Sequence, residues 1–270
     1  MSNSGIVSSL AQKLRTGDPV YLAWCCLGSP QAAESMLREG YDAAMLDMQH
    51  GPFDFASTVR GIELALLAGK PTMARIPVGD FAMASKLLDF GCAGIIAPMI
   101  NSVEDAKAFA KAMKYPPVGE RSWGPARTMA LDGRADLMAY LAEANRDTLA
   151  IAMIETRAAL EAIDDILAVP GIDGVLLGPA DLSIALTNGG LVNAEGDVVN
   201  AELDRIAGAA RRAGKIASSF CGSGARANAL VAKGFQLVSA GLDFSVLRIG
   251  SQTELKIARE GGAAKGPGGY

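Results

Sequence analysis

Four polar side chains stand at or just after the ends of short apolar runs, and their types suit proton transfer and metal binding. They are His50, Arg75, Glu155 and Asp181. A histidine exchanges protons near neutral pH, and an arginine stabilises a carboxylate or a developing oxyanion. Carboxylates hold a hard divalent cation such as Mg²⁺ or Mn²⁺ when water and substrate oxygens complete the shell. The set predicts metal-assisted proton transfer, with His50 as the general base.

Each of these residues also has an ordinary structural explanation. His50, the single histidine of the chain, could belong to a surface loop, and Arg75 could form a salt bridge at a rim. Glu155 could cap the following helix, and Asp181 could be the N-cap of a helix that starts at Leu182, which is a frequent role for aspartate. The functional interpretation therefore requires that the four groups meet at one place.

Lysine positions distinguish two ways of stabilising a carbanion. A Schiff-base mechanism needs a lysine that projects into the site, but none of the apolar runs ends in lysine. Lys70 precedes one run and Lys215 opens another, which puts both at the opposite side of the expected sheet. A metal, rather than an imine, is then expected to act as the electron sink.

Eight short apolar runs alternate with stretches of helical periodicity. The runs cover residues 20–26, 43–48, 72–76, 94–98, 149–154, 174–177, 216–220 and 236–240, and helical periodicity covers 31–39, 55–68, 82–90, 103–113 and 158–168. Continuous apolarity is typical of parallel strands buried on both faces, so the pattern predicts a (β/α)₈ TIM barrel. A doubly wound open sheet is the alternative, but residues 27–30 lack a GxGxxG fingerprint. In a barrel, the polar residues at the strand ends share one rim.

The organisation along the chain indicates one large domain. We expect residues 1–260 to form it and the glycine-rich residues 261–270 to be a flexible tail. The long connection 101–148 contains an expected extra helix near 135–144, and an insertion of this length is typical of a lid or a subunit contact. Residues 244–260 are expected to form the eighth helix.

Composition favours a small-molecule partner. The chain has 270 residues, half of them hydrophobic, and a net charge of −4, so it has no basic surface for nucleic acid or an anionic membrane. No apolar run is long enough for a signal peptide or a membrane span. The four cysteines lack CxxC spacing, which argues against a zinc site and a disulfide framework and suits a reducing cytoplasm.

Several motifs, taken in order, are together highly specific. They lie at residues 41–51, 74–75, 87–91, 97–99, 115–121, 154–155 and 171–183. Through them, nearly the whole chain resembles the HpcH/HpaI family of class II pyruvate aldolases. The resemblance implies a barrel of the phosphoenolpyruvate/pyruvate type that forms or cleaves 4-hydroxy-2-oxo acids, using pyruvate or a related 2-oxo acid and an aldehyde. It also implies a metal-stabilised enolate, with Mg²⁺, Mn²⁺ or Co²⁺ as the cofactor.

The resemblance also implies roles for individual residues. His50 accepts the proton, Arg75 stabilises the enolate, and Glu155 and Asp181 bind the metal. The backbone at Gly178, Pro179 and Ala180 contacts the substrate, and Trp24 and Phe220 line the aldehyde pocket, although both also suit an ordinary barrel core. The sequence departs from dicarboxylate-cleaving members at Gln49 and Met153, where glutamate and glutamine occur, which puts the physiological aldehyde in doubt.

One implied role meets a topological difficulty. Asp89 is implied to raise the basicity of His50, yet it ends a helix before the fourth strand and should lie at the far face of its own barrel. A neighbouring subunit would then supply it. The family usually exchanges its last helix between subunits and builds dimers into hexamers, so we expect a homo-oligomer.

Two other functions stay open from the sequence. A CoA-thioester lyase of the citrate lyase β or malyl-CoA type shares the pair of metal-binding carboxylates, but it needs basic residues for the CoA phosphates, and no such cluster is evident. A barrel without activity is the other alternative, and the complete set of His50, Arg75, Glu155 and Asp181 argues against it.

Overall fold

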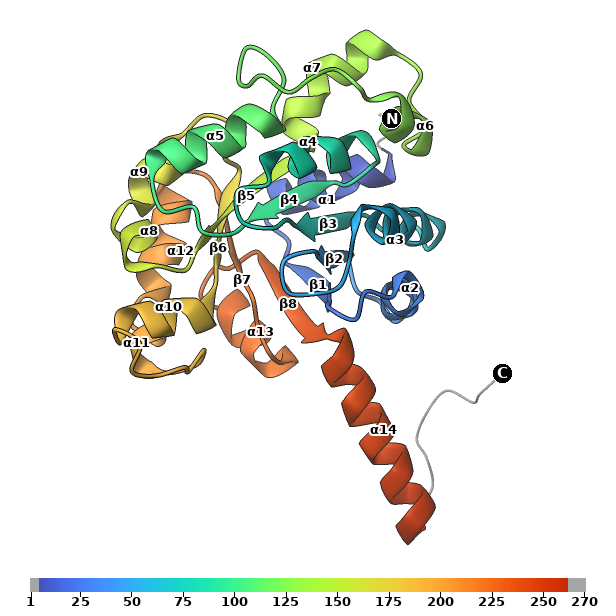
Figure 1. The fold of residues 1–270 in the computed structure, drawn as a ribbon, viewed down its shortest axis with the longest axis vertical. Helices are drawn as coiled ribbons and strands as arrows, with labels where there is room; N and C mark the ends of the chain where they lie inside the picture. Colours follow the sequence, from blue (N-terminus) through green and yellow to red (C-terminus); the bar gives the residue numbers. More distant parts are fainter. Residues whose placement is uncertain (1–4, 262–270) are drawn as a thin grey trace.

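Eight parallel strands close into a barrel in the order β1 to β8 (Figure 1). In this computed structural model, which describes residues 5–261, the strands are β1 Val20–Cys25, β2 Ala43–Asp47, β3 Thr72–Arg75, β4 Gly94–Ala97, β5 Leu149–Ile154, β6 Gly174–Leu177, β7 Ile216–Ser219 and β8 Leu237–Leu242. Each lies within two residues of its predicted run. The predicted TIM barrel is confirmed, and the open sheet is excluded.

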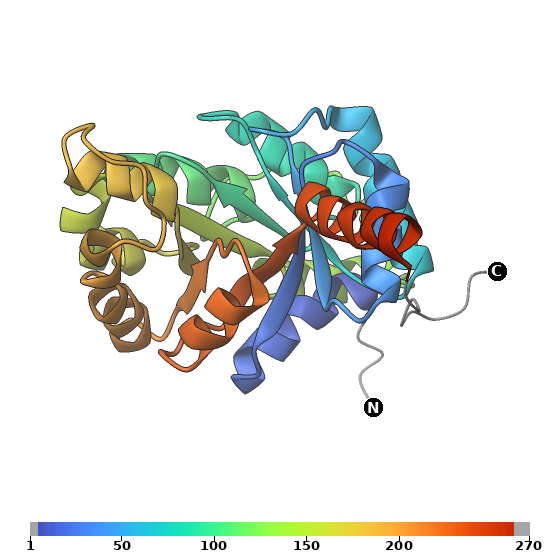
Figure 2. The same cartoon turned by 90° about the horizontal axis from the view of Figure 1, so that it is seen from below.

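Helices form the outer layer around the strands (Figure 2). They are α1 Ile6–Thr16, α2 Pro30–Arg38, α3 Phe55–Leu67, α4 Phe81–Asp89, α5 Val103–Met113, α6 Ala126–Leu131, α7 Leu137–Asp147, α8 Arg157–Glu161, α9 Ile163–Ala168, α10 Pro179–Leu186, α11 Asp197–Asn200, α12 Leu203–Arg212, α13 Gly224–Val231 and α14 Asp243–Glu260. The single helix predicted over 158–168 is two helices, because the backbone turns at Ala162. None of the described helices is both long and apolar enough to span a bilayer.

The strands alternate between two buried layers, as the two-residue period of a strand requires. On β1, Leu22 and Trp24 face the barrel interior, whereas Ala23 and Cys25 pack under the helices. Because the alternation holds along the strands, apart from an irregularity at the end of β8, the strands present their last inward side chains at the C-terminal rim, where barrel active sites lie. The register aligns the rim, since Asp47 of β2 pairs with Arg75 of β3.

The N-terminal end of the barrel is closed. Leu10 and Leu14 of α1 are buried in the same cluster as the barrel interior. The insertion between α5 and β5 lies at this end too, where α7 packs against α1, and Figure 1 shows α6 and α7 at the end opposite to α14. The insertion is therefore not a lid over the strand ends of its own chain; of the two predicted roles, the lid is wrong and the subunit contact stays a prediction.

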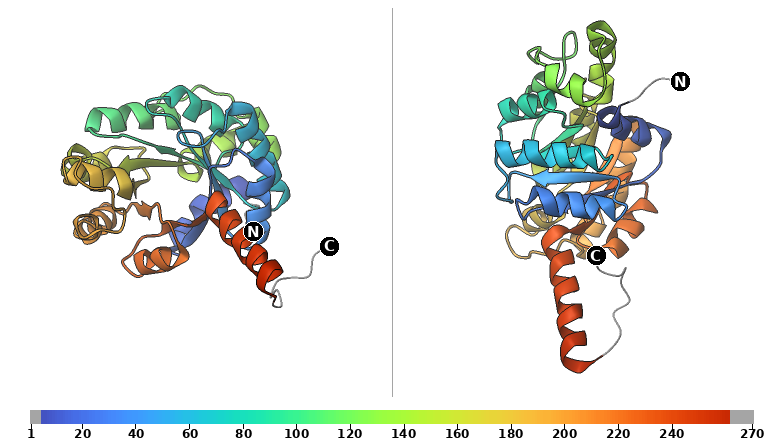
Figure 3. Two further views of the ribbon diagram at one scale, coloured as in Figure 1. Left: turned by 60° about the horizontal axis from the view of Figure 1, so that its bottom comes forward. Right: turned by 90° about the vertical axis from the view of Figure 1, so that its right-hand side faces the viewer.

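α14 projects from the C-terminal end of the barrel into open space (Figure 3). The eighth helix is confirmed, and it begins one residue before its predicted start. Within the described chain it contacts β1, β8 and the helix α2. The predicted tail falls almost wholly on residues 262–270, which, like residues 1–4, lie outside the described part of the chain.

Candidate active site

The last inward residues of β2 and β3 form a buried ion pair. Arg75 Nε donates to Asp47 Oδ1 at 3.0 Å, and Arg75 Nη2 donates to Asp47 Oδ2. Asp47 is fully buried and Arg75 is 8% exposed. The two-pronged geometry fixes the guanidinium plane, because a planar fork matches a carboxylate. Nη1 takes no part in the pair.

Asp47 also organises the neighbouring segments. Its Oδ1 accepts from the backbone N–H groups of Gln49 and His50, at 3.1 and 3.2 Å. Its Oδ2 accepts from Trp24 Nε1 at 3.1 Å and from the Cys26 thiol at 3.4 Å. One carboxylate thus holds the arginine and the turn that carries the histidine. Asp47 was not among the residues singled out from the sequence, although it lies within the motif at residues 41–51; its position as the last inward residue of β2 was the available signal.

The ion pair keeps Asp47 ionised. Burial alone raises the pKa of a carboxyl group, but the hydrogen bond and positive charge of Arg75 oppose it, as do the donors from His50 and Trp24. The balance holds the pKa of Asp47 below its ordinary value. Asp47 is therefore a permanent counter-ion for Arg75. Arg75 both forms the rim salt bridge that was its structural explanation and lines the pocket.

Glu155 is a buried carboxylate at the end of β5 with no basic residue bonded to it among the described residues. It is 3% exposed, and its Oε1 accepts from the Met99 N–H at 2.7 Å. Burial raises the pKa of Glu155, and the charge of Asp181 adds to that effect, while the Met99 N–H and Arg75 oppose it.

Gly178 lets the backbone of the next strand approach Glu155. A Cβ at this position would lie 2.7 Å from Glu155 Oε2 and 2.8 Å from Glu155 Cβ. α10 begins directly afterwards at Pro179, and Asp181 lies in its first turn, with Gly178 as the N-cap. The alternative that Asp181 caps a helix starting at Leu182 is therefore wrong. Asp181 is exposed at the rim beside the buried Glu155.

These residues surround a small pocket at the C-terminal rim. It has a volume of about 150 Å³ and is lined by His50, Arg75, Met153, Gly178, Pro179, Ala180, Asp181 and Phe220. The structure thus brings together the sequence-predicted base, arginine and substrate-contacting backbone. No lysine is among the lining residues of this pocket.

Trp24 and Phe220 lie against one another at this rim. Their ring centroids are 4.9 Å apart in an edge-to-face arrangement, and the Arg75 guanidinium lies 5.0 Å from the centre of the Trp24 ring. Trp24 is 1% exposed, whereas Phe220 reaches the pocket. Trp24 therefore acts as a wall behind Arg75, and Phe220 alone of the two lines the open space.

The chain matches known proteins over nearly its full length. The family model for HpcH/HpaI aldolase/citrate lyase matches residues 21–249. The chain belongs to this family. It is 39% identical over 251 residues to a hydroxypyruvate/pyruvate aldolase of Rhizorhabdus wittichii, covering 92% of this chain and 98% of the relative. It is 40% identical over 183 residues to a 4-hydroxy-2-oxovalerate aldolase of Novosphingobium aromaticivorans, covering 66% and 67%.

A solved structure agrees with this assignment. An HpcH/HpaI aldolase from Desulfitobacterium hafniense superposes with a TM-score of 0.84 at 29% identity, covering 96% of this chain and 99% of that chain. The relatives are aldolases, and this HpcH/HpaI family chain is a carbon–carbon lyase of the aldolase type.

Asp89 lies away from the pocket of this family member. It ends α4, five residues before β4 begins at Gly94, and its Oδ1 accepts from Arg121 Nη2 at 2.6 Å. Burial raises the pKa of Asp89 despite the opposing charge of Arg121. Within one chain the carboxylate therefore belongs to the N-terminal end of the barrel, and the topological difficulty anticipated from the sequence is real.

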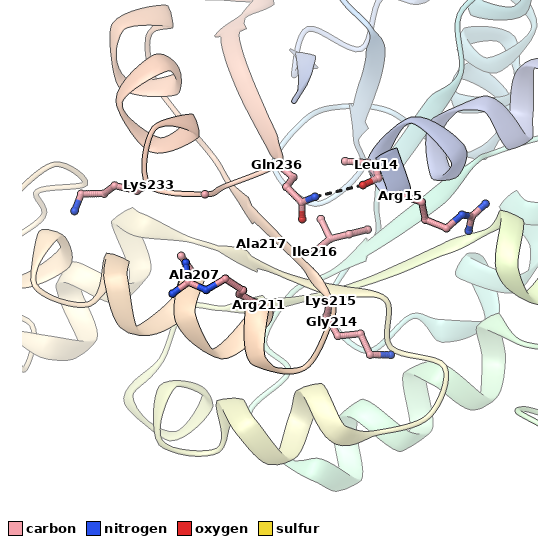
Figure 4. A pocket seen from close by; sticks show the side chains of 11 residues that line it. Leu14, Arg15, Ala207, Arg211, Gly214, Lys215, Ile216, Ala217, Lys233 and Gln236 are labelled. Carbon is pink, nitrogen blue, oxygen red and sulfur yellow. Dashed lines mark hydrogen bonds between the residues drawn. The ribbon is translucent and has the colours of Figure 1, made fainter. Parts of the chain in front are cut away.

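A larger cavity of about 500 Å³ lies at the N-terminal end of the barrel (Figure 4). It is lined by Leu14, Arg15, Ala207, Arg211, Gly214, Lys215, Ile216, Ala217, Lys233, Gly234 and Gln236. Arg15 and Arg211 belong to the last turns of α1 and α12, where cations offset the negative end of a helix dipole. Lys215 donates to the Ile172 carbonyl at 2.6 Å. This lining contains no carboxylate or histidine, so the smaller pocket is the candidate active site.

Proposed function

We propose that the chain is a divalent-metal-dependent class II aldolase that forms or cleaves 4-hydroxy-2-oxo acids, with pyruvate or a related 2-oxo acid and an aldehyde as the two components. The observation that carries this proposal is the grouping of His50, Arg75 and Asp181 around one pocket, with the buried Glu155 beside Asp181. These groups suit the removal of a proton and the stabilisation of the resulting negative charge.

The carboxylate pair fits a divalent cation. Among residues 5–261, no cluster of three or more His, Cys, Asp or Glu side chains could hold a metal alone. Glu155 is nevertheless buried without a basic partner, and Asp181 adds a second negative charge. Two carboxylates completed by water and substrate oxygens are typical of Mg²⁺ and Mn²⁺ sites. A cation held there would supply Lewis-acid stabilisation of charge on the 2-oxo acid.

The protein side chains account for the proton movements. In the cleavage direction, His50 takes the proton from the C4 hydroxyl, the C3–C4 bond breaks, and the aldehyde leaves. The electron pair of that bond remains on the 2-oxo acid as an enolate, whose oxygen Arg75 stabilises through Nη1. The same histidine then returns its proton to C3. Gly178, Pro179 and Ala180 supply the wall against which the 2-oxo acid is oriented.

Asp89 enters this proposal through a second subunit. Since it lies at the N-terminal end of its own barrel, we propose that a partner chain brings it to His50 in a homo-oligomer. The side chain of Asp89 is 24% exposed beside Arg121, so one part of the carboxylate faces outward and is open to a partner. The test is to measure the two single variants side by side: Asp89→Asn should lose exchange of the pyruvate C3 protons, as His50→Ala does.

The decisive experiment is exchange of the pyruvate C3 protons with deuterium, followed by NMR. Chelator-treated protein is compared with and without Mg²⁺, Mn²⁺ or Co²⁺, and His50→Ala is measured beside it. We expect metal-dependent exchange that falls by about 10²- to 10⁴-fold in the variant, the usual contribution of a positioned base. Absence of exchange with every metal contradicts the proposal, and turnover of malyl-CoA or citramalyl-CoA instead would assign the site to the lyase reaction.

A control separates this chemistry from a Schiff base. Borohydride added with pyruvate should not attach the substrate to the protein, because no described lysine lines the rim pocket. Lys70 and Lys215 lie at the N-terminal ends of β3 and β7, and the buried Lys114 bonds to Thr148 and Asp173, just before β5 and β6. Lys215→Ala should accordingly retain full exchange activity. A stable adduct by mass spectrometry would instead point to an imine.

A further inference from the structure

The junction between β8 and α14 carries a buried carboxylate, Asp243. It accepts hydrogen bonds from the backbone that follows β1, the strand that pairs with β8 in the closed barrel. Asp243 is the first residue of α14 and is 4% exposed. Its oxygens accept from the Cys26 N–H at 2.9 and 3.0 Å and from the Leu27 N–H at 2.8 Å. It also accepts from its own neighbour, the Phe244 N–H, at 2.8 Å. One side chain thus joins the base of α14 to the turn that follows β1.

The strand pairing is distorted in a way that permits this contact. The register between β1 and β8 shifts between Leu22 and Trp24, and Gly241 of β8 has a positive φ of 147°. A Cβ at Gly241 would lie 3.1 Å from the Tyr41 hydroxyl. The irregularity occurs just before Asp243, where it lets the chain turn out of the barrel and back toward Cys26.

The turn that Asp243 holds leads directly to the catalytic pocket. The Cys26 thiol donates to Asp47 Oδ2 at 3.4 Å. Asp47 in turn binds the Arg75 fork and the His50 N–H. A continuous series of contacts therefore runs from the base of α14, through Asp243 and Cys26, to the groups that stabilise the enolate and move the proton.

We infer that Asp243 is a positioning residue of the aldolase site, which makes the base of α14 part of the machinery that places Arg75 and His50. The kinetic test of this inference rests on the proposed function, whereas the alkylation of Cys26 described below does not. Asp243 touches no substrate. Its role is to fix the Cys26 turn, so its loss should reduce kcat more than it changes the KM for pyruvate.

The variant Asp243→Asn keeps the size of the side chain but replaces one accepting oxygen with an NH₂ group, which cannot accept from the backbone N–H groups of Cys26 and Leu27. A matched control is Asp42→Asn. Asp42 directly precedes β2, and its Oδ2 accepts from the N–H of Tyr21, near the start of β1, at 2.9 Å. Its Oδ1 pairs with Lys13 at 2.6 Å, and neither contact leads to a catalytic group. We expect kcat for Asp243→Asn to fall by about ten- to a hundredfold, the usual result of displacing a reacting group. The control should keep the wild-type kcat, whatever its melting temperature.

Alkylation of Cys26 gives a readout that does not depend on substrate. Of the free cysteines, Cys26 is the one that is partly exposed. Burial, Asp47 and Asp243 raise its pKa to about 12, so the wild-type thiol should react slowly with iodoacetamide at pH 8. Asp243→Asn removes one of those charges and releases the turn, and labelling of Cys26, followed by mass spectrometry, should quicken several-fold. Asp42→Asn should label like the wild type.

The combined outcomes decide the matter. A lower kcat together with faster Cys26 labelling, both absent in Asp42→Asn, supports the positioning role. An unchanged kcat, equal losses in both variants, or an unchanged labelling rate overturns it. If Asp243→Asn does not fold, Asp243→Glu, which keeps the charge but shifts it by one methylene group, is judged by the same two readouts. A wild-type protein without pyruvate exchange contradicts the proposed function, and the labelling comparison then decides this inference alone.

Discussion

At the scale of single residues, Asp47 is the group on which the most contacts converge. We expect Asp47→Asn to lower the free energy of unfolding by about 3–5 kcal/mol, because it leaves the Arg75 guanidinium buried without a counter-ion. Urea unfolding at pH 7 measures the loss. Glu34→Gln is the control, since its exposed ion pair with Arg38 should contribute no more than about 1 kcal/mol. Similar losses in the two variants would contradict the assigned role.

The stability difference between the wild type and Asp47→Asn should depend on pH in a defined direction. Because the pKa of Asp47 is lowered below its ordinary value of 3.8 in the folded chain, ionisation of this group stabilises the fold above about pH 4. That contribution is lost as the pH falls below 3.8 through the folded pKa. The stability difference between the wild type and Asp47→Asn should therefore be constant near neutrality and narrow in acid. A difference that grows in acid would oppose this explanation.

The pKa of Glu155 is shifted in the opposite direction to that of Asp47. Burial and Asp181 raise its pKa above the ordinary value of 4.5, so the ionised carboxylate destabilises the metal-free fold at neutral pH. We expect Glu155→Gln to raise the melting temperature of chelator-treated protein at pH 7. The wild type should gain stability on addition of Mn²⁺, and the variant should lose most of that gain. An equal gain in both proteins would show that Glu155 does not bind the metal.

At the scale of elements, the strands were predictable because their apolar runs are continuous and their register follows from the alternation. The helix α10 was considered only with a start at Leu182, which is three residues too late, although Pro179 at its first position was a usable signal. The individual contacts were less accessible. Sequence spacing placed His50 and Arg75 at one rim, but the bond between Arg75 and Asp47 depends on the register of β2 against β3, which spacing alone does not specify.

The turn between β6 and α10 gives a test at this scale. Gly178→Ala should displace Glu155, because the added Cβ would lie within 2.8 Å of its Cβ and 2.7 Å of Oε2. We expect metal-dependent exchange to fall by about tenfold or more, since small displacements of positioned groups are costly. Gly222→Ala, at the end of the next strand, is the control because its Cβ would meet no atom within 4 Å. Unchanged activity in Gly178→Ala would mean that Glu155 tolerates displacement.

At the scale of the whole molecule, α14 is the feature that a single chain leaves unexplained. Phe244 and Leu247 lie three residues apart on one side of the helix, and Val246 and Ile249 share another side. All four are exposed, with Leu247 at 61% and Ile249 at 63%. A projecting helix with apolar residues on two sides is not stable in water by itself, so both sides are expected to be covered.

A second copy of the chain is the expected cover, because an exchanged terminal helix buries both sides at once and closes the assembly by symmetry. The double substitution Leu247→Ser and Ile249→Ser should therefore reduce the mass measured by light scattering, from a dimer-built oligomer toward the monomer. Leu67→Ser is the control, since Leu67 is 76% exposed at the end of α3, away from the projecting helix. If Asp89 reaches His50 across this interface, dissociation should also abolish exchange of the pyruvate C3 protons. A dissociated protein with full activity would place every catalytic group within one barrel, and a wild-type monomer would remove the need for a partner altogether.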